Sequence, residues 1–218
     1  MYFYFLIEDK SGKTLIDALM SKIQEKYKNV MYDCKAFSGI GGFTRKNTIK
    51  ETKTGKLLND LTTYLKGFNK SLAGIESSVV VVLDNDERNT EVFKTQLEYI
   101  VTSNMITIDH IFAIAIEEIE AWLLGDINAV ISAYPDAKRQ ILNNYENDLI
   151  CGTWETLANA IYPGGLSKMK KDCPTFVEKG KIKSEWAKNI GSFMDIENNK
   201  SPSFQFFITE LKKRCLVA

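Results

Sequence analysis

The sequence predicts an α/β fold, with a mostly parallel sheet flanked by helices and a helical appendage at the C-terminal end. Apolar, β-rich runs alternate four times with amphipathic helical stretches within residues 1–132, and strand signals disappear after that point. Such alternation is typical of a parallel sheet with helical crossovers. We therefore expect an α/β core at 1–132 and a helical appendage at 133–218 that packs on it.

The N-terminal half contains two strand–helix units. Residues 1–8 are mostly aromatic and β-branched, as a buried strand requires. Apolar residues recur at helical spacing over 13–28, and a short strand is expected at 30–37. A basic, Thr-rich stretch at 44–54 reads as a loop and precedes a second amphipathic helix at 57–68.

The next two units contain the clearest strand of the chain. Residues 77–83 include the run Val-Val-Val-Val-Leu, and apolar side chains on both faces are typical of a central parallel strand. A helix is expected at 89–101, and a further buried strand at 106–116. A helix that contains Trp122 follows this strand.

Composition narrows the class of protein. The 28 basic residues balance the 28 acidic ones, so the chain lacks the excess charge of a protein that coats nucleic acid. An enzyme whose metal ions supply local positive charge remains compatible with this balance. The first residues lack the basic region of a signal peptide, and no apolar stretch is long enough to span a membrane.

Cysteine and histidine usage limits the chemistry further. Cys34, Cys151, Cys173 and Cys215 are scattered without a CxxC pair, which favours reduced thiols and a cytoplasmic location. The single histidine, His110, lies in an apolar run and is interpreted as structural. His-rich zinc sites and His-dependent triads are therefore disfavoured, and carboxylates would have to bind a hard ion, Mg²⁺ or Mn²⁺.

Acidic residues follow three of the expected strands. Parallel sheets bind ligands at the carboxyl ends of their strands, where these acids would meet. Crowded carboxylates repel one another unless a cation neutralises them, and paired Mg²⁺ ions held by carboxylates are suited to phosphoryl displacement. The acids concerned are Glu8, then Asp84 and Asp86, then Glu117, Glu118 and Glu120.

Each acid also has a structural interpretation. Glu8 could be a surface residue at a strand end, and Asp84 and Asp86 could cap the next helix. The two aspartates would point the same way if the chain stays extended. Glu117, Glu118 and Glu120 could form the acidic first turn of a helix, and Glu117 is interpreted in this way. Taken together, the remaining acids favour a metal site over separate structural roles.

Several segments resemble a known family. Leu-Ile-Glu-Asp at 6–9 and Val-Leu-Asp-Asn-Asp at 82–86 resemble the Glu and DxD signatures of Toprim domains, found in topoisomerases, primases and OLD-type nucleases. The segment at 113–126, with Glu-Ile-Glu-Ala-Trp-Leu-Leu-Gly-Asp at its end, resembles the ELEAWLLAD block of a group of uncharacterised bacterial Toprim-like proteins. Ser-Pro-Ser-Phe at 201–204 is similar to the Ser-Phe element of that group.

The resemblance implies a Toprim-like fold and assigns roles to individual residues. Glu8 would be a metal ligand and a general base, and Asp84 and Asp86 would bind Mg²⁺ or Mn²⁺. Glu118 and Glu120 match the two glutamates of the block and would complete the metal site. Glu8, Asp84, Asp86 and Glu120 would be the catalytic set.

The function expected on this basis is that of a Mg²⁺-dependent nuclease or phosphotransferase acting on DNA or RNA. OLD-type relatives pair a Toprim domain with an ATPase, so the resemblance points to a separate ATPase subunit and to phage defence. A haloacid-dehalogenase-type phosphatase is an alternative, because an apolar strand ending in DxD is also its signature. That family usually has the DxD on its first strand with a threonine soon after. Here a complete βαβα unit precedes the DxD and the next threonine, Thr90, lies further along the chain, which disfavours this alternative. A non-catalytic scaffold that binds a nucleotide or a protein partner is the third interpretation.

Two further segments resemble binding motifs. Ser-Gly-Lys-Thr at 11–14 resembles half of a phosphate-binding loop, but Ile7 stands where its first glycine is required. The stretch 154–186 mixes aromatic residues with lysines, which suits either a helical core or stacking against nucleic acid bases.

Overall fold

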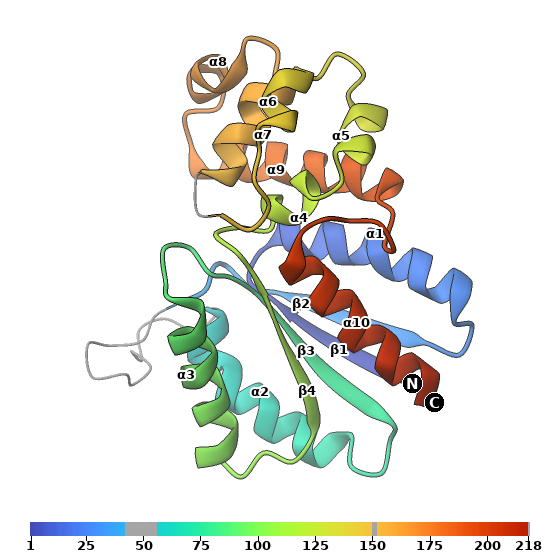
Figure 1. The fold of residues 1–218 in the computed structure, drawn as a ribbon. Helices are drawn as coiled ribbons and strands as arrows, with labels where there is room; N and C mark the ends of the chain where they lie inside the picture. The colour runs from blue at the N-terminus through green and yellow to red at the C-terminus, as the bar shows by residue number, and fades with distance from the viewer. Residues whose placement is uncertain (42–55, 150–151, 218) are drawn as a thin grey trace.

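A computed structural model describes residues 1–41, 56–149 and 152–217. Four strands form one sheet in the order β2-β1-β3-β4, and every pairing in it is parallel. The fold class predicted from the sequence is therefore confirmed: a parallel sheet flanked by helices, with a C-terminal helix (Figure 1). The strands are β1 (Tyr2–Ile7), β2 (Met31–Ala36), β3 (Ser77–Asp84) and β4 (Asp109–Ala115).

Among the described residues, three helices connect the strands, and the others follow β4. The connecting helices are α1 (Lys10–Lys26), α2 (Leu57–Ser71) and α3 (Thr90–Ser103). The helices after β4 are α4 (Glu120–Leu124), α5 (Ile127–Ala133), α6 (Arg139–Asn143), α7 (Thr153–Ile161), α8 (Gly165–Asp172), α9 (Phe176–Phe193) and α10 (Pro202–Val217). One face of the sheet packs on α2 and α3, and the opposite face packs on α1 and α10, while α9 packs against α1 (Figure 1).

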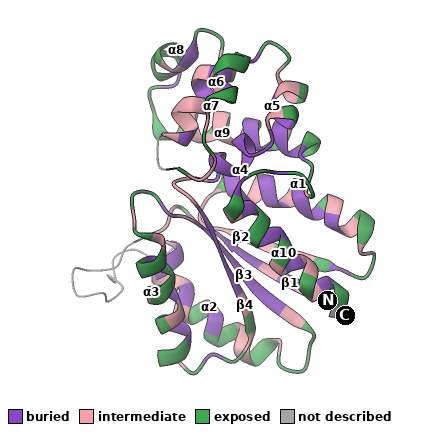
Figure 2. Cartoon of the chain, in the orientation of Figure 1, coloured by how far each residue is buried: buried purple, intermediate pink, exposed green. Residues whose placement is uncertain are grey.

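The central strand β3 explains the valine run. Val80 and Val82 belong to the core on the α1 side, whereas Val79, Val81 and Leu83 belong to the core on the α2 side. Side chains alternate between the two faces of a strand, so an apolar residue is needed at every position when both faces are covered. Figure 2 shows this strand buried along most of its length.

Close contact between two helices brings the appendage to the sheet edge. α9 packs along α1, and a Cβ added at Gly191 would lie 3.1 Å from both Ala18 and Leu15. A larger residue at Gly191 would separate the two helices. This packing holds α9 near the N-terminal end of α1, which follows directly on β1.

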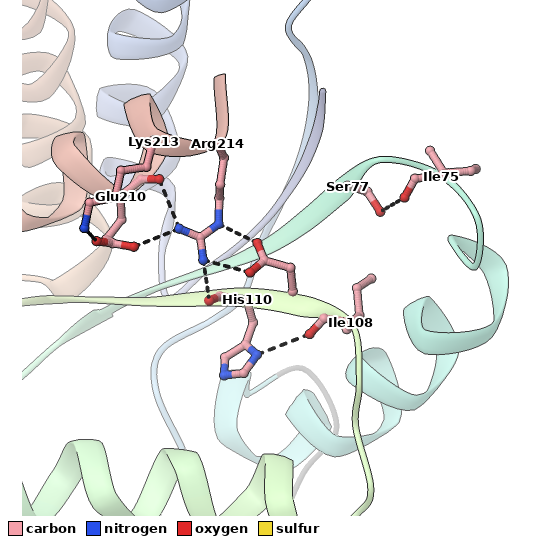
Figure 3. A network of polar contacts seen from close by, with 8 residues as sticks. Ile75, Ser77, Ile108, His110, Glu210, Lys213 and Arg214 are labelled. Atoms are coloured by element: carbon pink, nitrogen blue, oxygen red, sulfur yellow. Dashed lines mark hydrogen bonds and ion pairs between the residues drawn. The ribbon is translucent and has the colours of Figure 1, made fainter. Parts of the chain in front are cut away.

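A network of polar contacts fastens α10 to the start of β4 (Figure 3). The Arg214 guanidinium donates hydrogen bonds to both carboxylate oxygens of Asp109 and to the backbone oxygen of His110, and it also pairs with Glu210. The two ring nitrogens of His110 lie 3.2 Å from the Ile108 backbone oxygen and 3.3 Å from the Glu98 carboxylate. These contacts agree with the structural role predicted for the histidine.

Some expected boundaries differ from the structure. Helix α1 begins three residues before the expected position because the Asp9 side chain caps it, accepting a hydrogen bond from the Gly12 backbone N–H at 2.7 Å. β4 begins at Asp109 rather than at 106. The loop expected at 44–54 lies outside the described residues. Among the helices that the structure describes, none combines the length and apolar character that crossing a bilayer demands.

Candidate functional site

Two of the predicted acids meet at the carboxyl edge of the sheet. Glu8 directly follows β1, and Asp84 is the last residue of the neighbouring strand β3. Because Ile7 pairs with Val82 in the parallel register, the two strands end side by side. A Glu8 carboxylate oxygen accepts a hydrogen bond from the Asp84 backbone N–H at 3.1 Å. Glu8 therefore lies beside the DxD segment, as the sequence predicted.

The segment after β4 supplies two more carboxylates, and both contact one lysine. Lys183 Nζ lies 3.3 Å from Glu118 Oε2 and 3.0 Å from Glu120 Oε2. The Glu120 side chain is fully buried, and that of Lys183 is only 15% exposed. Lys183 lies on α9, so the C-terminal appendage contributes the cation of this cluster. A buried ion pair of this kind needs every partner, because an isolated buried charge is strongly unfavourable.

Burial dominates the protonation of the cluster. It raises the pKa of Glu8 to about 7, and the nearby charge of Asp86 acts in the same direction. Burial and the charge of Glu120 raise the pKa of Glu118 to about 8. Burial and the Glu8 charge raise the pKa of Asp84 well above its usual range. These carboxyl groups would therefore hold protons more tightly than free acids do.

The cluster contains more carboxyl groups than its lysine can pair with. The charges of Glu8, Lys183 and Glu120 all act on Asp84, so the groups lie within one electrostatic environment. Burial tends to lower the pKa of Lys183, but the carboxylates of Glu120 and Glu118 outweigh it and raise that pKa. Glu120 Oε1 is buried and has no hydrogen-bond donor among the residues that the structure describes. An additional cation would pair with the Glu120 oxygen and would allow more of these carboxyl groups to ionise.

The donor set fits a hard divalent cation in its chemistry. Carboxylate oxygens are the ligands that Mg²⁺ and Mn²⁺ prefer. As the side chains stand, however, no three acidic, Cys or His residues within 1–41, 56–149 and 152–217 converge closely enough to hold an ion. Lys183 takes the position between Glu118 and Glu120. Metal binding would therefore need these side chains to turn toward a shared point as the lysine withdraws.

The expectation for Asp86 needs a correction. The sequence interpretation assumed an extended chain, in which Asp84 and Asp86 point the same way. The strand instead ends at Asp84, and Asp86 is exposed, with φ +48°. Its carboxylate pairs with Arg88 at 2.5 Å. Neither aspartate caps α3, because Asn89 does so by accepting a hydrogen bond from the Val92 backbone N–H. Asp86 influences Glu8 electrostatically, and its role as a ligand remains a prediction.

Glu117 has a structural role that differs from the expected one. It precedes α4 with φ +62°, instead of lying in the first turn of that helix. Its carboxylate accepts hydrogen bonds from the backbone N–H groups of Gly152 at 2.9 Å and Thr153 at 2.6 Å. Glu117 thus caps the N-terminus of α7, a location where negative charge is favourable.

We expect Glu117→Ala to lower the free energy of unfolding by about 1 kcal/mol, since it removes the acceptor for two N–H groups at the α7 N-terminus. Urea denaturation measures this effect. Glu155→Gln, which neutralises an acid in the first turn of the same helix, is the charge-matched control. A change in Mn²⁺-dependent stabilisation with Glu117→Ala would place that residue in the metal site and contradict the assignment.

The two segments that carry the family resemblance contact each other. The Trp122 indole N–H donates to the Ser203 hydroxyl at 3.0 Å, and its ring stacks on Phe207 with centroids 5.0 Å apart. Asp148 accepts hydrogen bonds from the Ser201 hydroxyl and the Ser203 backbone N–H. The aromatic part of the Glu-Ile-Glu-Ala-Trp segment therefore anchors α10, while its two glutamates belong to the carboxylate cluster.

Lys183 was not among the residues selected from the sequence. A signal for it exists, because Lys183, Trp186, Ala187 and Ile190 follow the i, i+3, i+4, i+7 spacing of a buried helix face. The last three are buried in the core. A lysine on a buried helix face is usually paired with an acidic residue. This spacing could therefore have predicted that Lys183 contacts the acids at the sheet edge.

Comparison of the chain with family models, with curated proteins and with solved structures finds no match. Arguments about function therefore rest on the fold and on the arrangement of these side chains.

Proposed function

We propose that this protein is a Mg²⁺- or Mn²⁺-dependent nuclease that hydrolyses phosphodiesters of DNA or RNA. The observation that carries the proposal is a cluster at the carboxyl edge of a parallel sheet, in which Glu118 and Glu120 contact Lys183 and Asp84 and Glu8 lie beside them. Ligand sites of open α/β sheets lie at this edge. The excess of buried carboxylates and the unpaired Glu120 oxygen favour a cation-binding site over a purely structural ion pair.

Each residue of the cluster would have its own role in hydrolysis. Divalent cations, when bound, supply charge stabilisation and a more acidic water molecule. Asp84, Glu118 and Glu120 would hold them, with Asp86 as a further ligand if its loop turns inward. Glu8, with a pKa of about 7, can accept a proton from the attacking water near neutral pH. Lys183, once separated from its glutamates, would pair with a phosphate oxygen.

The resemblance to Toprim-like proteins supports the same proposal and adds a partner. It suggests a separate ATPase subunit and a role in phage defence. The balanced charge of the chain provides little general attraction for nucleic acid, so we expect weak activity in isolation and more with that subunit. We place this activity in the cytoplasm, where Cys34, Cys173 and Cys215, which are free thiols in the structure, would remain reduced.

The phosphatase interpretation is less compatible with the site. It requires the first aspartate of the DxD, Asp84, to attack phosphorus and the second, Asp86, to act as acid or base beside it. Asp86 is instead exposed and pairs with Arg88. A complete βαβα unit also precedes β3, whereas that family usually carries its DxD on the first strand. These observations favour metal-dependent hydrolysis of phosphodiesters.

Cleavage of plasmid and single-stranded substrates with Mg²⁺ or Mn²⁺ tests the proposal. We expect Glu8→Gln and Asp84→Asn each to lower cleavage about 100-fold or more, since both alter groups expected at the metal. Glu117→Ala is the matched control on the same segment and should retain activity. Cleavage that survives EDTA or Asp84→Asn would contradict the proposal. Turnover of phosphate monoesters alone would favour a phosphatase, and metal binding without any turnover would favour a scaffold.

A further inference from the structure

A cavity lies within the helical appendage, apart from the carboxylate cluster. It has a volume of about 520 Å³ and is lined by three segments: the chain around 133–138, the chain around 160–164, and one face of α9. This volume lies within the range of small-molecule sites, which is roughly 300–1,000 Å³. None of the four carboxylates of the candidate site lines it.

Three aromatic side chains line this cavity, and two of them are fixed at their polar ends. The Tyr134 hydroxyl accepts a hydrogen bond from the Asn189 amide at 3.1 Å. The Tyr162 hydroxyl donates one to Asp172 at 2.9 Å. Because the hydroxyl groups are engaged, the position of each ring is fixed before a ligand binds. Such preorganisation lowers the entropy lost on binding.

The third aromatic residue provides a hydrogen-bond donor without an acceptor. Trp186 lines the cavity and is only 3% exposed. Its indole N–H donates no hydrogen bond within the described part of the chain, in contrast to that of Trp122, which donates to Ser203, and it is not among the fully buried polar atoms. This donor therefore remains accessible and can hydrogen-bond to a ligand in the cavity. A flat heterocycle with acceptor atoms on its edge would satisfy this group.

The cavity is adjacent to the carboxylate cluster because α9 contributes to both. Lys183 and Trp186 are three residues apart, a rise of about 4.5 Å along the helix. The surrounding segment is also basic, with seven lysines and four acids between residues 153 and 188, whereas the whole chain is neutral. The cavity lining itself contains one lysine, Lys138, and two acids, Asp136 and Glu185, all exposed, so the positive charge comes from the surrounding segment. Positive charge beside aromatic surfaces is typical of sites for single-stranded nucleic acid.

We propose that this cavity binds an unpaired nucleobase of a nucleic acid strand whose backbone reaches the carboxylate cluster. The base stacks between the tyrosine rings and accepts a hydrogen bond from the Trp186 indole. The link between the two sites rests on the proposed nuclease function, but binding of the base itself does not need metal. The aromatic and lysine-rich stretch at 154–186 would thus contribute both to the helical core and to binding of nucleic acid bases, and Trp186 would take part in both.

Binding of a fluorescently labelled single-stranded oligonucleotide, measured by anisotropy in EDTA, tests this proposal. We expect Trp186→Phe to weaken binding about tenfold, because the ring is kept and the donor is lost. Tyr162→Leu should weaken it similarly by removing a stacking surface, and this variant is a check if Trp186→Phe proves unstable in thermal melts. Trp154→Phe is the control, since Trp154 does not line the cavity. A blunt duplex of equal length should bind independently of Trp186.

The outcomes separate this inference from the nuclease proposal. Unchanged affinity of both Trp186→Phe and Tyr162→Leu would overturn the cavity proposal, whatever the cleavage assay shows. Weakened binding in these variants, with Asp84→Asn still binding and no cleavage by the wild type, would support the cavity and contradict the nuclease. Binding of a nucleoside monophosphate that depends on Trp186, without binding of the oligonucleotide, would overturn the assignment to a strand.

Discussion

In the absence of divalent ions, the free energy of unfolding should fall by several kcal/mol between pH 5 and pH 8. Burial raises the pKa of Glu8 from 4.5 to about 7 and that of Glu118 from 4.5 to about 8. Above pH 4.5 the unfolded chain releases these protons while the folded protein keeps them, so unfolding becomes more favourable as pH rises. The loss ends once the pH exceeds about 7 for Glu8 and about 8 for Glu118. Each pKa unit corresponds to about 1.4 kcal/mol.

Urea denaturation in EDTA at pH 5, 6.5 and 8 measures this profile. Glu8→Gln and Glu118→Gln should each flatten it, which separates the contribution of the cluster from that of other titrating groups. At pH 8, Mn²⁺ at about 100 times its dissociation constant should restore roughly 2.7 kcal/mol. The prediction is contradicted if the free energy of unfolding of the wild type rises between pH 5 and pH 8 and both variants show the same profile. The pKa values of Glu8 and Glu118 would then not be raised.

Lys183→Met should destabilise the metal-free protein by about 3–5 kcal/mol at pH 8. The substitution keeps the length and apolar stem of the side chain but removes the only cation that contacts Glu118 and Glu120 within the described residues. Glu118 and Glu120 would then face each other without a counter-charge, and each of them that stays ionised at pH 8 is unfavourable. Lys181→Met is the matched control, because Lys181 is exposed on the same helix, and its effect should stay within about 0.5 kcal/mol.

Two further measurements locate this effect in the cluster. Adding Glu120→Gln to Lys183→Met should recover part of the lost stability, because one of the uncompensated charges is removed. Mn²⁺ should stabilise Lys183→Met more than the wild type, since the ion no longer competes with the ammonium group. If Lys183→Met resembles Lys181→Met, or if Mn²⁺ stabilises it less than the wild type, Lys183 does not neutralise a cation site.

The fold was predictable because its signals are local. The valine run of β3 and the helical periodicity of α1 and α2 each lie within a short window of sequence, and burial on one or both faces is read directly from them. Alternation of these elements then restricts the sheet to parallel pairing. The acids at the ends of β1, β3 and β4 were located by the same reasoning, because parallel strands end at one edge.

Tertiary structure decided which of these acids act together and what faces them. Glu118 and Lys183 are 65 residues apart, and the lysine reaches the cluster only because α9 packs along α1. Glu117 leaves the cluster because the distant N-terminus of α7 offers it two N–H groups, and Asp86 turns outward where β3 ends. Local periodicity contains no information about such contacts between distant segments. The sequence by itself determined the sheet and the edge that carries the acids, and the packing of the helices determined the cluster around Lys183.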